Sequence, residues 1–125
     1  MDKQNIWQVA ILEDSVVQAL NLSYKAGTPI LIGDKNIEHM ISEHPDHYVK
    51  YGEKIADIIS SPTYLAKHPS KDSIEYIKVF KDEDGEHVLV AVRATGSGVL
   101  FARTLFIMTD EKIDKYRKNG AFIEL

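Results

Sequence analysis

Three of the five histidines lie close together in the first half of the chain, at His39, His44 and His47. The ordinary pKa of histidine suits acid–base chemistry near neutral pH, and its ring nitrogens also bind metal ions. The segment contains no HExxH pattern, and Pro45 prevents His44 and His47 from sharing one continuous helical face. We therefore expect no metal site here. Two interpretations stay open: acid–base catalysis, or histidines with an ordinary surface or core role.

The elements that carry these and other polar residues divide the chain into a helical first half and a strand-rich second half. Helical periodicity covers residues 14–22, 34–44 and 46–60, with a short strand at 29–32. Period-two alternation predicts strands over residues 73–81, 87–95 and 99–108, followed by a helix capped by Thr109 and a closing strand at 121–125. We predict an α+β domain whose N-terminal helices pack on a roughly four-stranded antiparallel sheet, with a C-terminal helix.

Residue parity along the predicted strands places cations on one face of the sheet. The second strand has an apolar face made of Val88, Val90 and Val92. Burying that face leaves Arg93 exposed, and the odd-numbered turn at 96–98 brings Arg103 to the same side. A first turn of two or four residues adds Tyr76 and Lys78 to the arginine face, whereas Thr104 falls on the opposite face. These residues predict an anion-binding surface.

The same cations have a second interpretation. Each long side chain could lie along a half-buried surface and pair with a nearby carboxylate such as Glu75 or Glu86. A β-bulge in either hairpin would also change which residues share a face.

Composition limits the class of protein. The chain has 125 residues, of which 44% are apolar and 27% charged, which fits one domain over residues 1–125 and excludes disordered and low-complexity proteins. The sequence shows no membrane-spanning stretch and no signal peptide, so we expect a cytoplasmic location. The absence of cysteine excludes disulfides and thiolate metal sites. The net charge of −4 argues against general duplex binding, although a few cations suffice for a site that acts on one phosphate.

Residues 31–45 contain the pattern G-x-x-N-I-x-H-M-x-x-x-H-P, which resembles the opening of a phage-associated nuclease domain. That domain belongs to the barnase/EndoU/colicin/RelE-like (BECR) superfamily. The resemblance continues through residues 73–80, 88–93 and 99–106, so that together the matching segments span about residues 30–118. It implies helices packed on a four-stranded antiparallel sheet, in agreement with the periodicity.

The resemblance also implies a function: a ribonuclease of phage toxin or effector type that cleaves RNA without a metal or other cofactor. In that chemistry the ribose 2′-hydroxyl attacks the adjacent phosphate and yields a 2′,3′-cyclic phosphate, which needs a base, an acid and cations. The catalytic residues carried over are His39 and His44 as acid and base, Arg93 and Arg103 as phosphate ligands, and Lys78 as an additional charge. Tyr76 and Thr104 are the expected substrate-binding residues. Should neither histidine act, the acid and base would be sought among Tyr76, Lys78 and Glu75.

Two other classes of function stay open. One is a catalytically inactive domain that binds RNA or a phage protein on the same fold, and the other is an enzyme of different chemistry, such as a nucleotide-using transferase. The expected partners are an RNA substrate and an immunity or antitoxin protein, with no membrane association. The sequence leaves the RNA target and the oligomeric state open.

Overall fold

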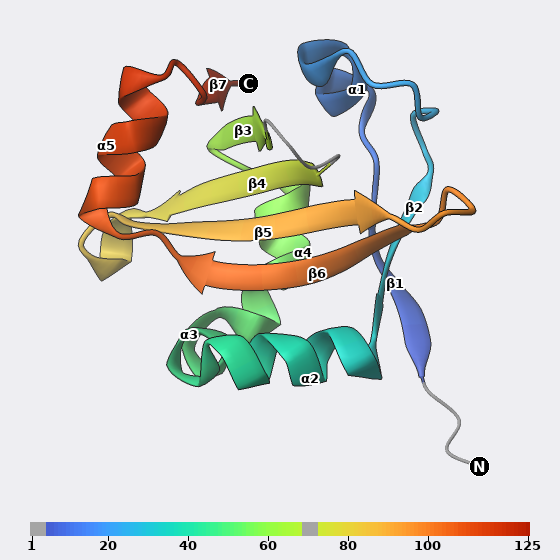
Figure 1. Ribbon diagram of the computed structural model, residues 1–125, viewed down its shortest axis with the longest axis horizontal. Coiled ribbons are helices and arrows are strands. Elements are labelled where there is room, and N and C mark those ends of the chain that lie inside the picture. Colours follow the sequence, from blue (N-terminus) through green and yellow to red (C-terminus); the bar gives the residue numbers. More distant parts are fainter. Residues whose placement is uncertain (1–4, 69–72) are drawn as a thin grey trace.

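The structure is a computed structural model that describes residues 5–68 and 73–125. Within these residues, one sheet contains seven strands in the order β1-β2-β6-β5-β4-β3-β7 (Figure 1). The strands are β1 (Ile6–Ile11), β2 (Pro29–Gly33), β3 (Tyr64–Lys67), β4 (Ser73–Phe80), β5 (Glu86–Ala94), β6 (Leu100–Ile107) and β7 (Ile123–Glu124). The helices are α1 (Asp14–Leu20), α2 (Asp34–Glu43), α3 (Pro45–Tyr51), α4 (Ile55–Ser60) and α5 (Asp110–Lys118), with 3₁₀ turns at Gly52–Lys54 and Lys81–Glu83.

The α+β class and the C-terminal helix are confirmed, but the sheet is larger than the four antiparallel strands expected. It is also mixed, because β2 runs parallel to β6 where Ile30 and Leu31 lie opposite the start of that strand. Sequence reasoning missed β1 and β3, which have only six and four residues and show no clear alternation. In the described residues, no helix combines the length and the apolar character that crossing a bilayer requires.

The C-terminal helix begins where its sequence predicted. The Thr109 hydroxyl accepts a hydrogen bond of 3.2 Å from the backbone N–H of Lys112, which satisfies one of the free donors of the first turn. Asp110 and Glu111 follow in that turn, where carboxylates interact favourably with the helix dipole. This start fixes α5 at one end of the sheet, as Figure 1 shows.

The two sides of the sheet differ in what covers them. One side, the core face, carries Val88, Val90 and Val92, which are fully buried as predicted. It packs against residues of α1, α2 and α4 in the main hydrophobic cluster, and α4 lies behind the sheet in Figure 1. The other side, the open face, packs against Ile113 and Tyr116 of α5.

The first hairpin has a different register from the one expected. Its connection spans five residues, because a 3₁₀ turn is followed by Asp84 and Gly85, whose φ angles are both positive (55° and 73°). Tyr76 therefore lies opposite Val90 and Lys78 opposite Val88, on the core face. The prediction that Tyr76 and Lys78 share the face of Arg93 is wrong, because an odd-numbered connection replaces the even-numbered one assumed.

The second hairpin contains a β-bulge. Val92 lies opposite Ala102 and Ala91 lies opposite Thr104, so that Arg103 is the extra residue of β6. Beyond the bulge the alternation of β6 is inverted relative to an uninterrupted strand. Thr104 consequently lies on the open face with Arg93, and the prediction that it lies on the opposite face is wrong.

We predict that Tyr76→Phe leaves the free energy of unfolding unchanged or raises it. The ring is 1% exposed, and its hydroxyl is buried with no hydrogen-bond partner among the described residues. Removing an unsatisfied buried hydroxyl relieves a desolvation penalty, whereas Tyr76→Ala should cost about 3–5 kcal/mol through the cavity it leaves. Urea denaturation of the three proteins measures both effects. A loss above about 1 kcal/mol in Tyr76→Phe would show that the hydroxyl is bonded.

Candidate active site

A row of mostly small side chains forms a hollow in the open face. Ala66 of β3 lies opposite Glu75 of β4, Glu75 lies opposite Ala91 of β5, and Ala91 lies opposite Thr104 of β6. Side chains that face each other across neighbouring strands point to the same side of the sheet. Because the alanines fill little space, a cavity of about 540 Å³ lies over Glu75, Ala91 and Thr104, bounded by α5.

Positive charge is concentrated around this cavity. Among the described residues, the charged side chains that face it are those of the three cations Arg93, Lys112 and Lys115 and of one carboxylate, Glu75. Lys67 also borders the cavity, but it lies opposite Ile74, so its side chain points to the core-face side. The chain as a whole carries a net charge of −4, so the cavity is cationic within an acidic protein. A concave surface lined with one sign of charge attracts ligands of the opposite sign. The cavity is therefore suited to an anion such as a phosphate group.

The carboxylate is held in place by a tyrosine of α5. Glu75 is 5% exposed, and its Oε1 accepts a hydrogen bond of 2.8 Å from the Tyr116 hydroxyl. Burial and this hydrogen bond raise the pKa of the Tyr116 phenol, so Tyr116 remains a protonated donor. The bond fixes the orientation of the Glu75 carboxylate at the bottom of the cavity.

A histidine also lines the cavity. His68 follows the last residue of β3, and its backbone N–H donates a hydrogen bond of 3.3 Å to the Ser73 carbonyl at the start of β4. Ala66 lies opposite Glu75, and His68 is two residues farther along the chain than Ala66. His68 and Glu75 therefore occupy diagonal positions on neighbouring segments of the open face. Diagonal neighbours lie about 7–8 Å apart at their backbones, close enough for both side chains to reach one ligand.

The two predicted arginines have different positions. Arg93 is exposed and lines the cavity together with Thr104. Arg103 is half-buried at the bulge, does not line this cavity, and has a buried Nε with no hydrogen-bond partner among the described residues. The predicted pair of phosphate-binding arginines is thus divided by the bulge.

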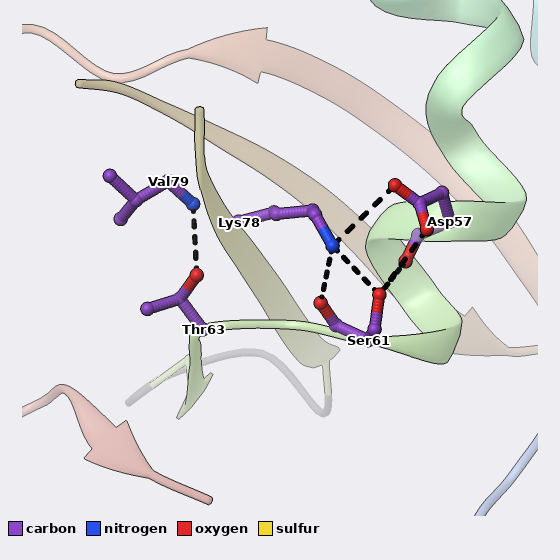
Figure 2. A network of polar contacts seen from close by, with 5 residues as sticks. All are labelled: Asp57, Ser61, Thr63, Lys78 and Val79. Carbon is purple, nitrogen blue, oxygen red and sulfur yellow. Dashed lines mark hydrogen bonds and ion pairs between the residues drawn. The ribbon is translucent and has the colours of Figure 1, made fainter. Parts of the chain in front are cut away.

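Lys78 and Tyr76 lie away from the cavity, on the core face. The Lys78 Nζ donates hydrogen bonds to the backbone carbonyl and the hydroxyl of Ser61, at 2.9 and 2.7 Å, and lies 3.5 Å from the Asp57 carboxylate. Figure 2 shows these contacts, together with the bond from the Val79 N–H to the Thr63 hydroxyl that ties β4 to the same loop. Lys78 therefore joins the end of α4 to the sheet. The core position of Tyr76 agrees with its near-complete burial.

The predicted catalytic histidines lie on the helices beside β6. His39 pairs with Glu43 at 2.7 Å on the exposed surface of α2, and neither residue lines the cavity. His44 precedes α3 and stacks on His47 with ring centroids 4.9 Å apart. It also contacts the ring of Phe106, a cavity-lining residue, at 5.7 Å. His44 thus touches the wall of the cavity, whereas His39 does not.

Sequence reasoning missed Lys67, His68, Lys112, Lys115 and Tyr116 as residues of one site. The first two belong to the unrecognised strand β3 and the residue after it. The spacing of Lys112, Lys115 and Tyr116 places them on one side of α5, which is a signal that could have been used. In the described part of the chain, no three His, Asp or Glu side chains are grouped as a metal site would require.

Comparison with known proteins identifies a family. The sequence model of the family described as phage-Barnase-EndoU-ColicinE5/D-RelE like nuclease3 matches residues 7–115. This span contains all four strands that line the cavity. No curated protein and no solved structure matches the chain.

We predict that the stability of the fold decreases as the pH falls below about 6.5, in part because of His47. Its Nδ1 accepts a hydrogen bond of 3.0 Å from the Ile107 N–H, which requires an unprotonated nitrogen. Burial, followed by the neighbouring His44 ring, lowers the pKa of His47 in the folded protein. The unfolded chain therefore takes up the proton first, and this part of the stability is retained only above the unfolded pKa.

Thermal melts between pH 5 and 8 test this dependence. His47→Ala should lose about 1 kcal/mol at pH 7.5 and a smaller amount at pH 5.5, because the hydrogen bond is already weakened there in the parent protein. An equal loss at both pH values would contradict the role assigned to His47.

Proposed function

The chain belongs to the phage-Barnase-EndoU-ColicinE5/D-RelE like nuclease3 family, and from that premise we propose that it is a metal-independent endoribonuclease acting in the cavity of the open face. The observation that carries this proposal is the cationic lining. Three cations, Arg93, Lys112 and Lys115, surround one carboxylate in a chain whose overall charge is negative. An RNA phosphate is the anion that a nuclease must hold.

Arg93 and the lysines around it would bind the scissile phosphate. A guanidinium donates two parallel N–H hydrogen bonds to a pair of phosphate oxygens. Of the two predicted arginines, Arg93 is the one that lines the cavity. Lys112 and Lys115 would add positive charge that offsets the charge developing on the phosphate during the reaction. The hydroxyl of Thr104, next to them, is a further donor to a phosphate oxygen.

The reaction we propose starts with attack of the ribose 2′-oxygen on the adjacent phosphorus. Glu75 accepts the proton of the 2′-hydroxyl as the new P–O bond forms, and His68 donates a proton to the 5′-oxygen as the P–O5′ bond breaks. The products are a 2′,3′-cyclic phosphate and a free 5′-hydroxyl. Glu75 and His68 are preferred for these roles because both line the cavity that holds the cations.

The two histidines predicted from the sequence, His39 and His44, have supporting roles at most in this proposal. His44 would support the cavity wall through Phe106, whose ring centroid also lies 4.7 Å from the Lys112 Nζ. His39 would contribute only if α2 approached the bound RNA. The family description supports a role in phages, and we extend the proposal to a toxin or effector that an immunity protein could neutralise.

We predict cleavage of a mixed single-stranded RNA pool in the presence of excess EDTA. The products should end in 2′,3′-cyclic phosphates, and an oligonucleotide with 2′-deoxyribose throughout should remain intact, since it lacks the nucleophile. Mass spectrometry of the products measures both. Cleavage of the DNA oligonucleotide, or RNA products that end in a free 3′-hydroxyl, would overturn the proposed reaction.

We predict that Arg93→Ala and Glu75→Gln each lower the single-turnover rate by about 100-fold or more. Arg117→Ala is the matched control, because Arg117 lies on α5 but does not line the cavity, and it should keep the parent rate. His39→Ala should also keep it, and His44→Ala should lose less than either cavity variant. Thermal melts establish that each variant is folded. Parent rates in the Arg93 and Glu75 variants would place the reaction elsewhere.

A further inference from the structure

The open face extends beyond the cavity as a second row of residues that crosses the sheet. Arg93 of β5 lies opposite Phe101 of β6, Phe101 lies opposite Leu31 of β2, and Leu31 lies opposite Gln8 of β1. Neighbouring strands are about 4.8 Å apart, so this row extends about 15 Å from Arg93. It begins at a residue of the cavity and ends at the edge strand β1.

The middle of this row is apolar but has no hydrophobic layer packed on it. Phe101 and Leu31 are half-buried, and neither belongs to the two hydrophobic clusters of the described residues. α5, which packs on the open face, lies at the opposite end of the sheet from β1 and β2 (Figure 1). Gln8 and Arg93 at the two ends of the row are exposed. From the cavity outward, the row therefore presents the guanidinium of Arg93, the ring of Phe101, the aliphatic side chain of Leu31 and the amide of Gln8.

We propose that the row Arg93–Phe101–Leu31–Gln8 binds unpaired nucleotides of RNA that continue from the cavity, which makes single-stranded RNA the substrate class. This inference rests on the proposed function, because the cationic cavity fixes one phosphate and so sets where the next nucleotides lie. A base stacks on the Phe101 ring, next to the scissile phosphate that Arg93 holds in the cavity, and Gln8 offers hydrogen bonds to a further base edge.

The chemistry of the row favours an unpaired strand over a duplex. In an RNA duplex the bases are stacked on each other, and their faces are unavailable to a protein side chain. A single strand exposes those faces, and every base has one, so an aromatic residue binds it with little sequence preference. The adjoining cations complement the charge of the backbone, which distinguishes this surface from an apolar interface with another protein.

The binding experiment uses a fluorescein-labelled 12-nucleotide RNA with 2′-O-methyl groups at every position. This probe lacks the free 2′-hydroxyl, so it remains uncleaved and its affinity is measured independently of catalysis. Fluorescence anisotropy compares it with a hairpin of the same chemistry whose bases are paired. We expect the single strand to bind at least tenfold more tightly than the hairpin.

Variants locate the binding surface. Phe101→Ala should weaken binding of the single strand by roughly 5- to 150-fold, the range expected for the loss of one stacked base, and Phe101→Tyr should retain affinity. Trp7→Ala is the matched control: Trp7 is an aromatic residue of β1, 43% exposed, but it lies opposite Ile32 and so points to the core-face side. It should bind like the parent protein. Thermal melts accompany each variant.

The outcomes separate this inference from the proposed function. Equal affinity for strand and hairpin, an unchanged affinity in Phe101→Ala, or an equal loss in Trp7→Ala would overturn the inference even if unmodified RNA is cleaved. Phe101-dependent binding of the single strand without cleavage of unmodified RNA would support the inference and overturn the ribonuclease reaction. Binding of neither 2′-O-methyl RNA would overturn the inference, and cleavage of unmodified RNA would then decide the proposed function by itself.

Discussion

The β-bulge at Arg103 decides which residues of β6 face the core and which face the cavity. It lets Leu105 and Ile107 continue the hydrophobic core after Ala102, while Thr104 and Phe106 lie beside Ala91 and Leu89 on the open face. Without the extra residue, the polar Thr104 would point into the core and the cavity would lose part of its wall. A bulge changes the direction in which the following side chains point. Here it lets β6 supply residues both to the hydrophobic core and to the cavity wall.

Placement of small and large residues explains why a cavity forms where it does. Ala66 and Ala91 flank Glu75, whereas the neighbouring positions toward α5, at Ile77 and Leu89, are bulky and pack against that helix. The same helix that closes the second hydrophobic cluster also supplies Lys112, Lys115 and Tyr116 to the cavity. Helix α5 therefore contributes both to stability and to the proposed chemistry. The packing of Ile113 against the sheet fixes the distance of Lys112 and Lys115 from the strands below them.

Sequence patterns predicted the elements better than their registers. The valine face, the α+β class and the Thr109 cap follow from local rules of burial and hydrogen bonding, and all three are present. The length of the first hairpin connection decides the face of Tyr76 and Lys78, and the bulge in β6 decides the face of Thr104. Apolar–polar alternation does not reveal either feature, because one additional residue moves every following side chain to the other face of the sheet. The contribution of α5 depended on tertiary packing. Arg93 was placed correctly on the accessible face because no bulge separates it from the valines of its own strand.

Whether RNA binds on the open face around Arg93 can be measured by an NMR titration of the ¹⁵N-labelled protein with the 2′-O-methyl single strand, following every backbone amide. Binding there should produce the largest shift changes at Glu75, Ala91, Arg93, Phe101 and Thr104, with little change in α2. Changes centred on α2 around His39, with the open-face amides unaffected, would show that RNA binds elsewhere.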